Sequence, residues 1–145
     1  MQKFAVLNTG TSAAASSGVI YAGLDRNSGP VGDDASGITA GTTEPSSTGS
    51  YARQAITWAT PVQGAADATV PALNSVAISW TSSAAYSTAA NTLGLVTLWN
   101  TATLATVAEA NFYGRAVIAV PQAVNASGIT LTIAISGLSM GFISA

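Results

Sequence analysis

Residues that could carry acid–base chemistry are few in this chain of 145 residues, which has six acidic and four basic side chains and neither histidine nor cysteine. Without these two residue types, a Ser-His-Asp or Cys-His catalytic arrangement and a zinc site with Cys or His ligands are excluded. A disulfide scaffold is excluded for the same reason. Candidate acids, bases and metal ligands are therefore the carboxylates of Asp25, Asp33, Asp34, Glu44, Asp67 and Glu109.

The first four of these carboxylates, Asp25 to Glu44, fall within one loop-like stretch. Hard cations such as Ca²⁺ bind several oxygen ligands from flexible loops, so a calcium site is one interpretation. The stretch lacks the Asp-x-Asp-x-Asp-Gly ladder, and we favour isolated, solvated carboxylates with no metal or cofactor. A glycosidase needs two carboxylates paired across a cleft, and nothing places Asp67 beside Glu109. We expect no enzymatic activity.

Two arginines, Arg53 and Arg115, lie inside expected strands, which is informative in a chain with so few charges. One interpretation is a clamp, between subunits or within a sheet, on a carboxylate or on backbone carbonyls, because the planar guanidinium offers five donors. The other is an outward-facing arginine whose stem covers apolar surface. The sequence leaves both interpretations open.

Composition limits the partners. The net charge is −2 with only four cations, whereas phosphate binding needs many Lys and Arg, so we expect no nucleic-acid partner. No stretch approaches the roughly 18 apolar residues of a membrane helix, so we expect no membrane partner. With 48% hydrophobic residues the chain is expected to be globular and self-associating rather than disordered.

Alternation of apolar and polar residues predicts β-strands, bounded by Gly, Pro, Asn and Ser turns. Each of Trp58, Trp80 and Trp99 closes an apolar strand, and we expect core positions for them rather than a sugar-binding surface. No amphipathic helical window is present. The pattern predicts an all-β fold, an antiparallel β-sandwich or jelly roll formed by one domain at 19–145. The expected strands lie at 19–24, 51–59, 76–80, 93–99, 112–120 and 129–135.

Details within three of these strands can be tested. In the strand at 51–59, Ala52, Gln54, Ile56 and Trp58 alternate with Arg53, Ala55 and Thr57. The strand at 93–99 has apolar residues on both faces and is expected to be buried on both. The strand at 112–120 is expected to end at Pro121.

The segment at 1–18 is rich in small residues and is expected to be a flexible N-terminal arm. Phe4, Val6 and Leu7 form its apolar anchor, which we expect at an interface. The segment at 25–50 is expected to be a long loop, and loops of this length are usually functional or mobile.

The chain stays apolar to its last residues, although most termini are polar unless docked. We expect the tail, with Met140, Phe142 and Ile143, to form a final strand or to pack against a neighbouring subunit.

One motif is specific. The segment Gly49-Ser50-Tyr51-Ala52-Arg53-Gln54-Ala55-Ile56-Thr57-Trp58 resembles the Gly-Gly-Tyr-Ala-Arg-Gln-Ala-Val-Thr-Phe segment of a family of small virion proteins from tailed bacteriophages. The order of features over about residues 19–136 is similar, from the loop ending at Glu44 to the Ile-Thr-Leu-Thr-Ile strand. Leu93 to Val96 departs from the family's Ile-Gly-Ile-Phe-Asp form, and the tail after Ser136 is extra.

Members of this family are commonly labelled head-decoration or tail-fibre proteins. The resemblance implies a structural protein of the virion. Together with the expected arm and the neutral composition, it leads us to expect a decoration protein on the capsid exterior, made in the host cytoplasm, which clamps adjacent capsomers as a homo-oligomer, a trimer by expectation. Its partners would be the major capsid protein and further copies of itself. The alternative is a tail-fibre or tail-tip component that contacts the host surface through exposed aromatic residues. The chain has no coiled-coil or collagen-like stalk, which favours decoration.

Overall fold

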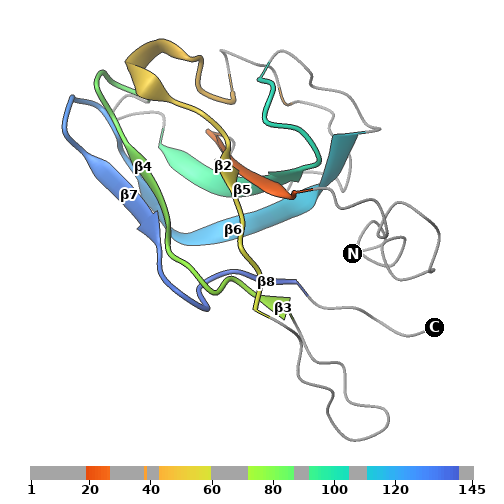
Figure 1. The fold of residues 1–145 in the computed structure, drawn as a ribbon. Coiled ribbons are helices and arrows are strands. Elements are labelled where there is room, and N and C mark those ends of the chain that lie inside the picture. The colour runs from red at the N-terminus through yellow and green to blue at the C-terminus, as the bar shows by residue number, and fades with distance from the viewer. Residues whose placement is uncertain are drawn as a thin grey trace, which may run out of the picture.

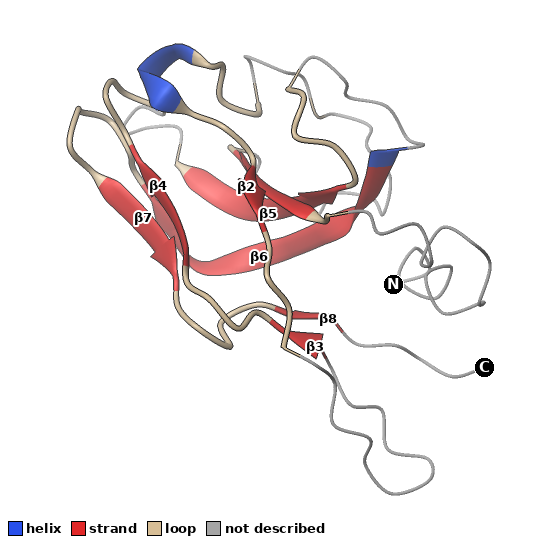
Figure 2. Cartoon of the chain, viewed as in Figure 1, coloured by secondary structure: helices blue, strands red, loops and turns tan. Residues whose placement is uncertain are grey.

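The computed structural model describes residues 19–26, 38, 43–59, 72–86, 92–104 and 111–140 (Figure 1). Regular structure in these ranges consists of strands, the 3-10 turn η1 and a single 3-10 residue, Asn111, before β6, and every strand pairing is antiparallel (Figure 2). The all-β expectation is confirmed. The elements are β1 (Tyr21–Asp25), η1 (Thr48–Ser50), β2 (Gln54–Ala55), β3 (Ala72–Leu73), β4 (Ile78–Thr81), β5 (Leu93–Trp99), β6 (Phe112–Gln122), β7 (Thr130–Ile133) and β8 (Ser139–Met140). The expected arm at 1–18, with Phe4, Val6 and Leu7, lies outside the described residues, as do Phe142 and Ile143.

A four-stranded sheet in the order β2-β1-β5-β6 forms the larger part of the fold. Its central strand β5 is buried at all seven positions, as the apolar residues on both of its faces predict. Strand register gives the sheet two distinct faces, because side chains on neighbouring strands share a face when they lie opposite one another. One face has Leu24 opposite Val96, and the other has Gly23 opposite Thr97, which in turn lies opposite Arg115.

The pair β4–β7 packs against the first of these faces. Ile78 and Trp80 point inward from β4 and Leu131 from β7, and they join Leu24 and Val96 in one buried cluster. The Trp80 indole also donates a hydrogen bond to the Ala52 carbonyl at 3.0 Å. Trp80 and Trp99 are 2% and 0% exposed, and Trp58 is half-buried, which confirms that the tryptophans belong mainly to the core.

Two strand predictions need correction. The segment at 51–59 does not alternate throughout: Arg53 is buried and Ala52 exposed, whereas Ile56 is buried three positions later. Only Gln54–Ala55 pairs with β1. Before this short strand the odd-numbered residue Arg53 is buried, and after it the even-numbered residue Ile56 is buried. In addition, β6 continues through Pro121 to Gln122. A proline is tolerated there because β6 is an edge strand, so the missing N–H breaks no second ladder.

Asn74 joins the small sheet β3–β8 to the end of β4–β7. Its side-chain amide donates to the carbonyls of Val76 and Ala134, both at 2.9 Å, and its side-chain oxygen accepts from the Leu138 N–H at 2.9 Å. Its own N–H and carbonyl bond Leu138 and Ser136. Asn74 is 0% exposed, and it satisfies one buried backbone group and two partly buried ones through its side chain.

The last described strand agrees with expectation. Ser139–Met140 pairs antiparallel with Ala72–Leu73, so the apolar tail begins as a strand. An interface role for Met140 stays a prediction.

Candidate functional site

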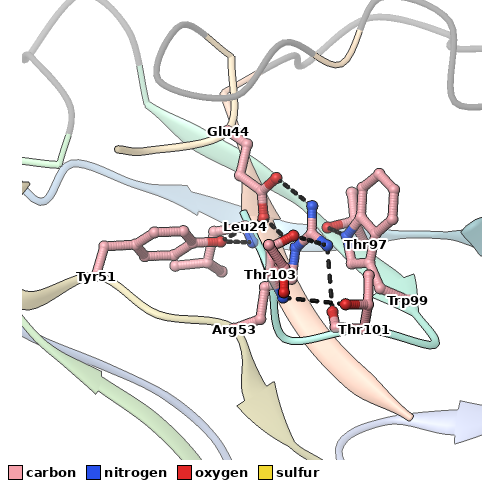
Figure 3. Close-up of polar contacts among 8 residues, drawn as sticks. All are labelled: Leu24, Glu44, Tyr51, Arg53, Thr97, Trp99, Thr101 and Thr103. Carbon is pink, nitrogen blue, oxygen red and sulfur yellow. Dashed lines mark hydrogen bonds and ion pairs between the residues drawn. The ribbon is translucent and has the colours of Figure 1, made fainter. Parts of the chain in front are cut away.

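The most concentrated polar chemistry in the described residues is a buried ion pair between Arg53 and Glu44 (Figure 3). The Arg53 Nε–Glu44 Oε1 distance is 2.8 Å and the Nη2–Oε2 distance is 2.7 Å, which is the two-pronged geometry of a strong guanidinium–carboxylate pair. Both side chains are 0% exposed. Arg53 Nη1 also donates to the carbonyls of Thr101 and Thr103, at 3.2 and 3.1 Å.

Arg53 is therefore a clamp, and it bonds both of the acceptor types expected of it, a carboxylate and backbone carbonyls. All these bonds lie within one chain. Because the guanidinium is fully buried, it does not reach the surface of the protomer. Any effect of Arg53 on association between copies would have to act through the fold.

Tyr51 extends the cluster. It lies two residues before Arg53, so extended backbone places both side chains on the same side. The Tyr51 hydroxyl donates to Glu44 Oε1 at 3.1 Å and accepts from the Leu24 N–H of β1 at 2.8 Å. Figure 3 shows this hydroxyl between the carboxylate and the strand.

Trp99 and Gly23 form the floor of the cluster on the four-stranded sheet. The Arg53 guanidinium carbon lies 3.8 Å from the centre of the Trp99 ring, a cation–π contact, and the Trp99 indole donates to Thr97 Oγ1 at 2.8 Å. A Cβ at position 23 would lie 2.6 Å from Thr97 Oγ1 and 2.8 Å from Glu44 Oε1. Only glycine lets the carboxylate approach β1 this closely.

This arrangement joins separate segments of the chain. Glu44 comes from the expected loop at 25–50, Arg53 directly precedes β2, and the two threonine carbonyls come from the segment after β5. Both Glu44 oxygens are bonded and the residue is 0% exposed. Chemically, the cluster is suited to holding the fold together, because no carboxylate oxygen in it faces solvent.

Burial raises the pKa of the Tyr51 hydroxyl well above its ordinary value of 10.0, and the Glu44 carboxylate raises this pKa further. The folded protein therefore keeps this proton at a pH where the unfolded chain releases it, so the free energy of unfolding should fall as pH rises above about 10. We expect the urea midpoint to fall less steeply with alkaline pH in Tyr51→Phe than in the wild type. Equal slopes for the two proteins would contradict this assignment.

Two other expected site residues, Asp25 and Arg115, come from β1 and β6. Asp25 ends β1, opposite Leu95, and is 0% exposed. The interpretation of solvated carboxylates is thus wrong for Asp25 and Glu44. Asp25 is buried at the end of β1, and Glu44 is buried in its ion pair with Arg53. Asp33 and Asp34 lie outside the described residues. Arg115 is half-buried in β6, with its guanidinium carbon 5.5 Å from the Phe112 ring centre, and its interface role stays a prediction.

Sequence reasoning identified Arg53 but missed its partner. Glu44 was grouped with the loop carboxylates, although an acid nine residues from a mid-strand arginine in so uncharged a chain is a usable signal. In the ranges that the structure covers, no group of three or more His, Cys, Asp or Glu residues comes together as metal ligands. Those ranges also contain no helix long and apolar enough to cross a membrane.

Comparison of the chain with protein-family models, with curated proteins and with solved structures found no match.

Proposed function

We propose that this chain is a non-enzymatic structural protein of a tailed-bacteriophage virion, a decoration protein that binds the outside of the capsid and stabilises contacts between capsomers. The observation that carries the proposal is the position of the Tyr-Ala-Arg-Gln-Ala motif, whose Tyr and Arg side chains lie in the buried cluster around Glu44. Tyr51 and Arg53 both bond Glu44, the residue that ends the loop before the motif. The features that resemble the virion family thus form one buried anchor of the fold.

A structural role also agrees with the chemistry of this anchor. The carboxylate of Glu44 is enclosed and fully bonded, so it is not placed for proton transfer to a bound substrate. A protein that stabilises a shell needs a rigid body and contact surface. The major capsid protein and further copies of this chain are the partners that such a role requires, with a trimer as the expected oligomer.

For the fold we propose an antiparallel β-sandwich or jelly roll. Two features support it: the β4–β7 pair packs against one face of the four-stranded sheet, and residues of both contribute to one apolar cluster. The N-terminal arm belongs to the same proposal, as the segment that would reach a neighbouring subunit or the capsid.

Exposed aromatic side chains would favour the tail-fibre alternative, because sugar rings stack on them. In the described part of the chain the aromatic residues are buried or half-buried, and the large exposed apolar side chains are aliphatic. This distribution favours decoration of the capsid over glycan binding at a fibre tip.

The location can be tested with gold-labelled antibody against this chain on intact particles of a phage that encodes it. We expect label over the whole head in electron micrographs, with preimmune serum as the control. Label confined to the tail would overturn decoration and favour the fibre alternative. Particles without any label would overturn both.

A further inference from the structure

The last described strand is held in the fold by a short ladder. β8 has two residues, Ser139 and Met140, and in the described part of the chain it pairs with β3 alone. Figure 1 shows this two-stranded sheet below β4 and β7, apart from the four-stranded sheet. Removing β8 from β3 therefore breaks no other strand pairing among the described residues.

A specific receptor on the rest of the fold binds this strand. The Asn74 side-chain oxygen accepts a hydrogen bond from the Leu138 N–H at 2.9 Å, and the Asn74 N–H donates to the Leu138 carbonyl at 3.1 Å. The Leu138 side chain is 5% exposed and belongs to the main apolar cluster. The tail receptor, defined here as β3, Asn74 and the apolar site of Leu138, thus recognises the segment 138–140 by its backbone and one buried side chain.

The observed occupant of the tail receptor also identifies a second one. Because the receptor binds the segment 138–140 of its own chain, it fits the identical segment of another copy with the same hydrogen bonds and the same buried leucine. No other partner has its complementarity to this site displayed by the structure itself.

The turn that leads into β8 is tight and strained. The Gly137 N–H donates to the Ala134 carbonyl at 2.9 Å, which closes the turn directly after β7. Ser136 in this turn has a φ of 61°, in the left-handed region that is unfavourable for residues other than glycine. Opening the turn into an extended chain relieves this strain. Short hinges under strain favour exchange of the element that follows them.

We propose that copies of this chain associate by exchanging the segment 138–140, so that β8 of one copy occupies the tail receptor of another. The turn at 135–137 opens, and the contacts of β8 with its receptor are kept, now between two copies. The chain's own β8 competes at the high effective concentration set by the short turn, so exchange requires crowded copies. The exchange names a contact for the self-association expected of a decoration protein, but it rests on the fold alone.

Introduced cysteines detect this exchange directly, because the chain has none of its own. Ala72 lies opposite Met140 in the β3–β8 ladder, and opposed residues are within reach of a disulfide. Full-length Ala72→Cys is mixed at millimolar concentration with isotope-labelled Met140→Cys and oxidised. Mass spectrometry then counts disulfides that join a labelled to an unlabelled chain. Ser79→Cys mixed with Thr132→Cys is the matched control, because these opposed, exposed positions lie before the hinge.

Hinge variants shift the equilibrium in opposite directions, measured by size-exclusion chromatography with light scattering. Ser136→Gly removes the strain of the closed turn and should raise the dissociation constant about tenfold per exchanged segment. Gly137→Ala should lower it, because a Cβ there would lie 2.9 Å from the Ala134 carbonyl oxygen when the turn is closed. Gly128→Ala is the control: it strains a different turn, at a φ of 82°, and should leave the oligomer mass unchanged.

The expected result is an Ala72→Cys link to Met140→Cys far more frequent than the control link, and more frequent still with Gly137→Ala present. A link no more frequent than the control would overturn the proposal, as would hinge variants that leave the oligomer mass unchanged. If circular dichroism shows Gly137→Ala to be unfolded, Ser136→Val tests the same shift. Antibody label on the wrong part of the virion would overturn the proposed function without affecting these measurements on isolated protein.

Discussion

Replacing Arg53 by methionine should lower the free energy of unfolding by about 3–5 kcal/mol, as is usual when one partner of a buried ion pair is removed. The physical reason is the carboxylate left behind. Glu44 is 0% exposed, and without Arg53 it keeps only the Tyr51 hydroxyl as a bonding partner among the contacts described above. Two backbone carbonyls, of Thr101 and Thr103, also lose their donor. Urea unfolding followed by tryptophan fluorescence measures the loss.

The double variant Arg53→Met with Glu44→Leu separates the ion pair from simple loss of packing. Apolar residues that replace both members of a buried pair are often tolerated, so the double variant should be more stable than Arg53→Met alone. Gln54→Ala, a change at the next residue, should cost less than about 0.5 kcal/mol. A melting temperature and oligomer mass unchanged in Arg53→Met would show that the clamp contributes nothing to stability.

Replacing Asn74 by alanine should cost on the order of 3 kcal/mol, because one buried backbone group and two partly buried ones lose their partner together. These are the carbonyls of Val76 and Ala134 and the N–H of Leu138. The Leu138 N–H is the group least able to bond water instead, since Asn74 and Leu138 are 0% and 5% exposed. The loss should be largest at the junction of β3–β8 with β4–β7.

Hydrogen exchange measured by mass spectrometry would locate that loss. We expect faster exchange at Leu138 and Ser136 in Asn74→Ala, with β5 unchanged under native conditions. Asn125→Ala is the matched control, because Asn125 is exposed in the turn before β7. If Asn125→Ala destabilises the protein as much as Asn74→Ala, the network around Asn74 is not the cause.

Local pattern predicted much of the fold where burial follows the strand period. The apolar content of 93–99 indicated a strand buried on both faces, and β5 is one. The alternation after Ile129 indicated β7, with Leu131 inward and Thr130 and Thr132 outward. The strand predicted at 129–135 is too long at its end, because β7 stops at Ile133 and Ile135 lies in a turn and is 63% exposed.

Pattern failed where a polar side chain takes a core position. At 51–59 the hydrophobic alternation assigned Arg53 to the face opposite Ile56, yet both are buried. Arg53 is inside because Glu44 neutralises it, and that compensation depends on a contact that alternation does not encode. Asn74 shows the same limit, since its bonding partners Ala134 and Leu138 are distant in sequence and only the fold brings them together.

The position of β5 between β1 and β6 has a consequence for synthesis on the ribosome. Its seven residues, Leu-Gly-Leu-Val-Thr-Leu-Trp, are uncharged and rich in β-forming side chains, a composition that aggregates readily when left unpaired. The pairing of Tyr21 with Trp99 joins residues about half a chain length apart and forms slowly, whereas β6 follows β5 closely. However, β1 has already been translated when β5 emerges. When β5 leaves the ribosome, its partner β1 is therefore already present, and its partner β6 is translated soon afterwards. Both pairings shorten the time for which β5 stays unpaired.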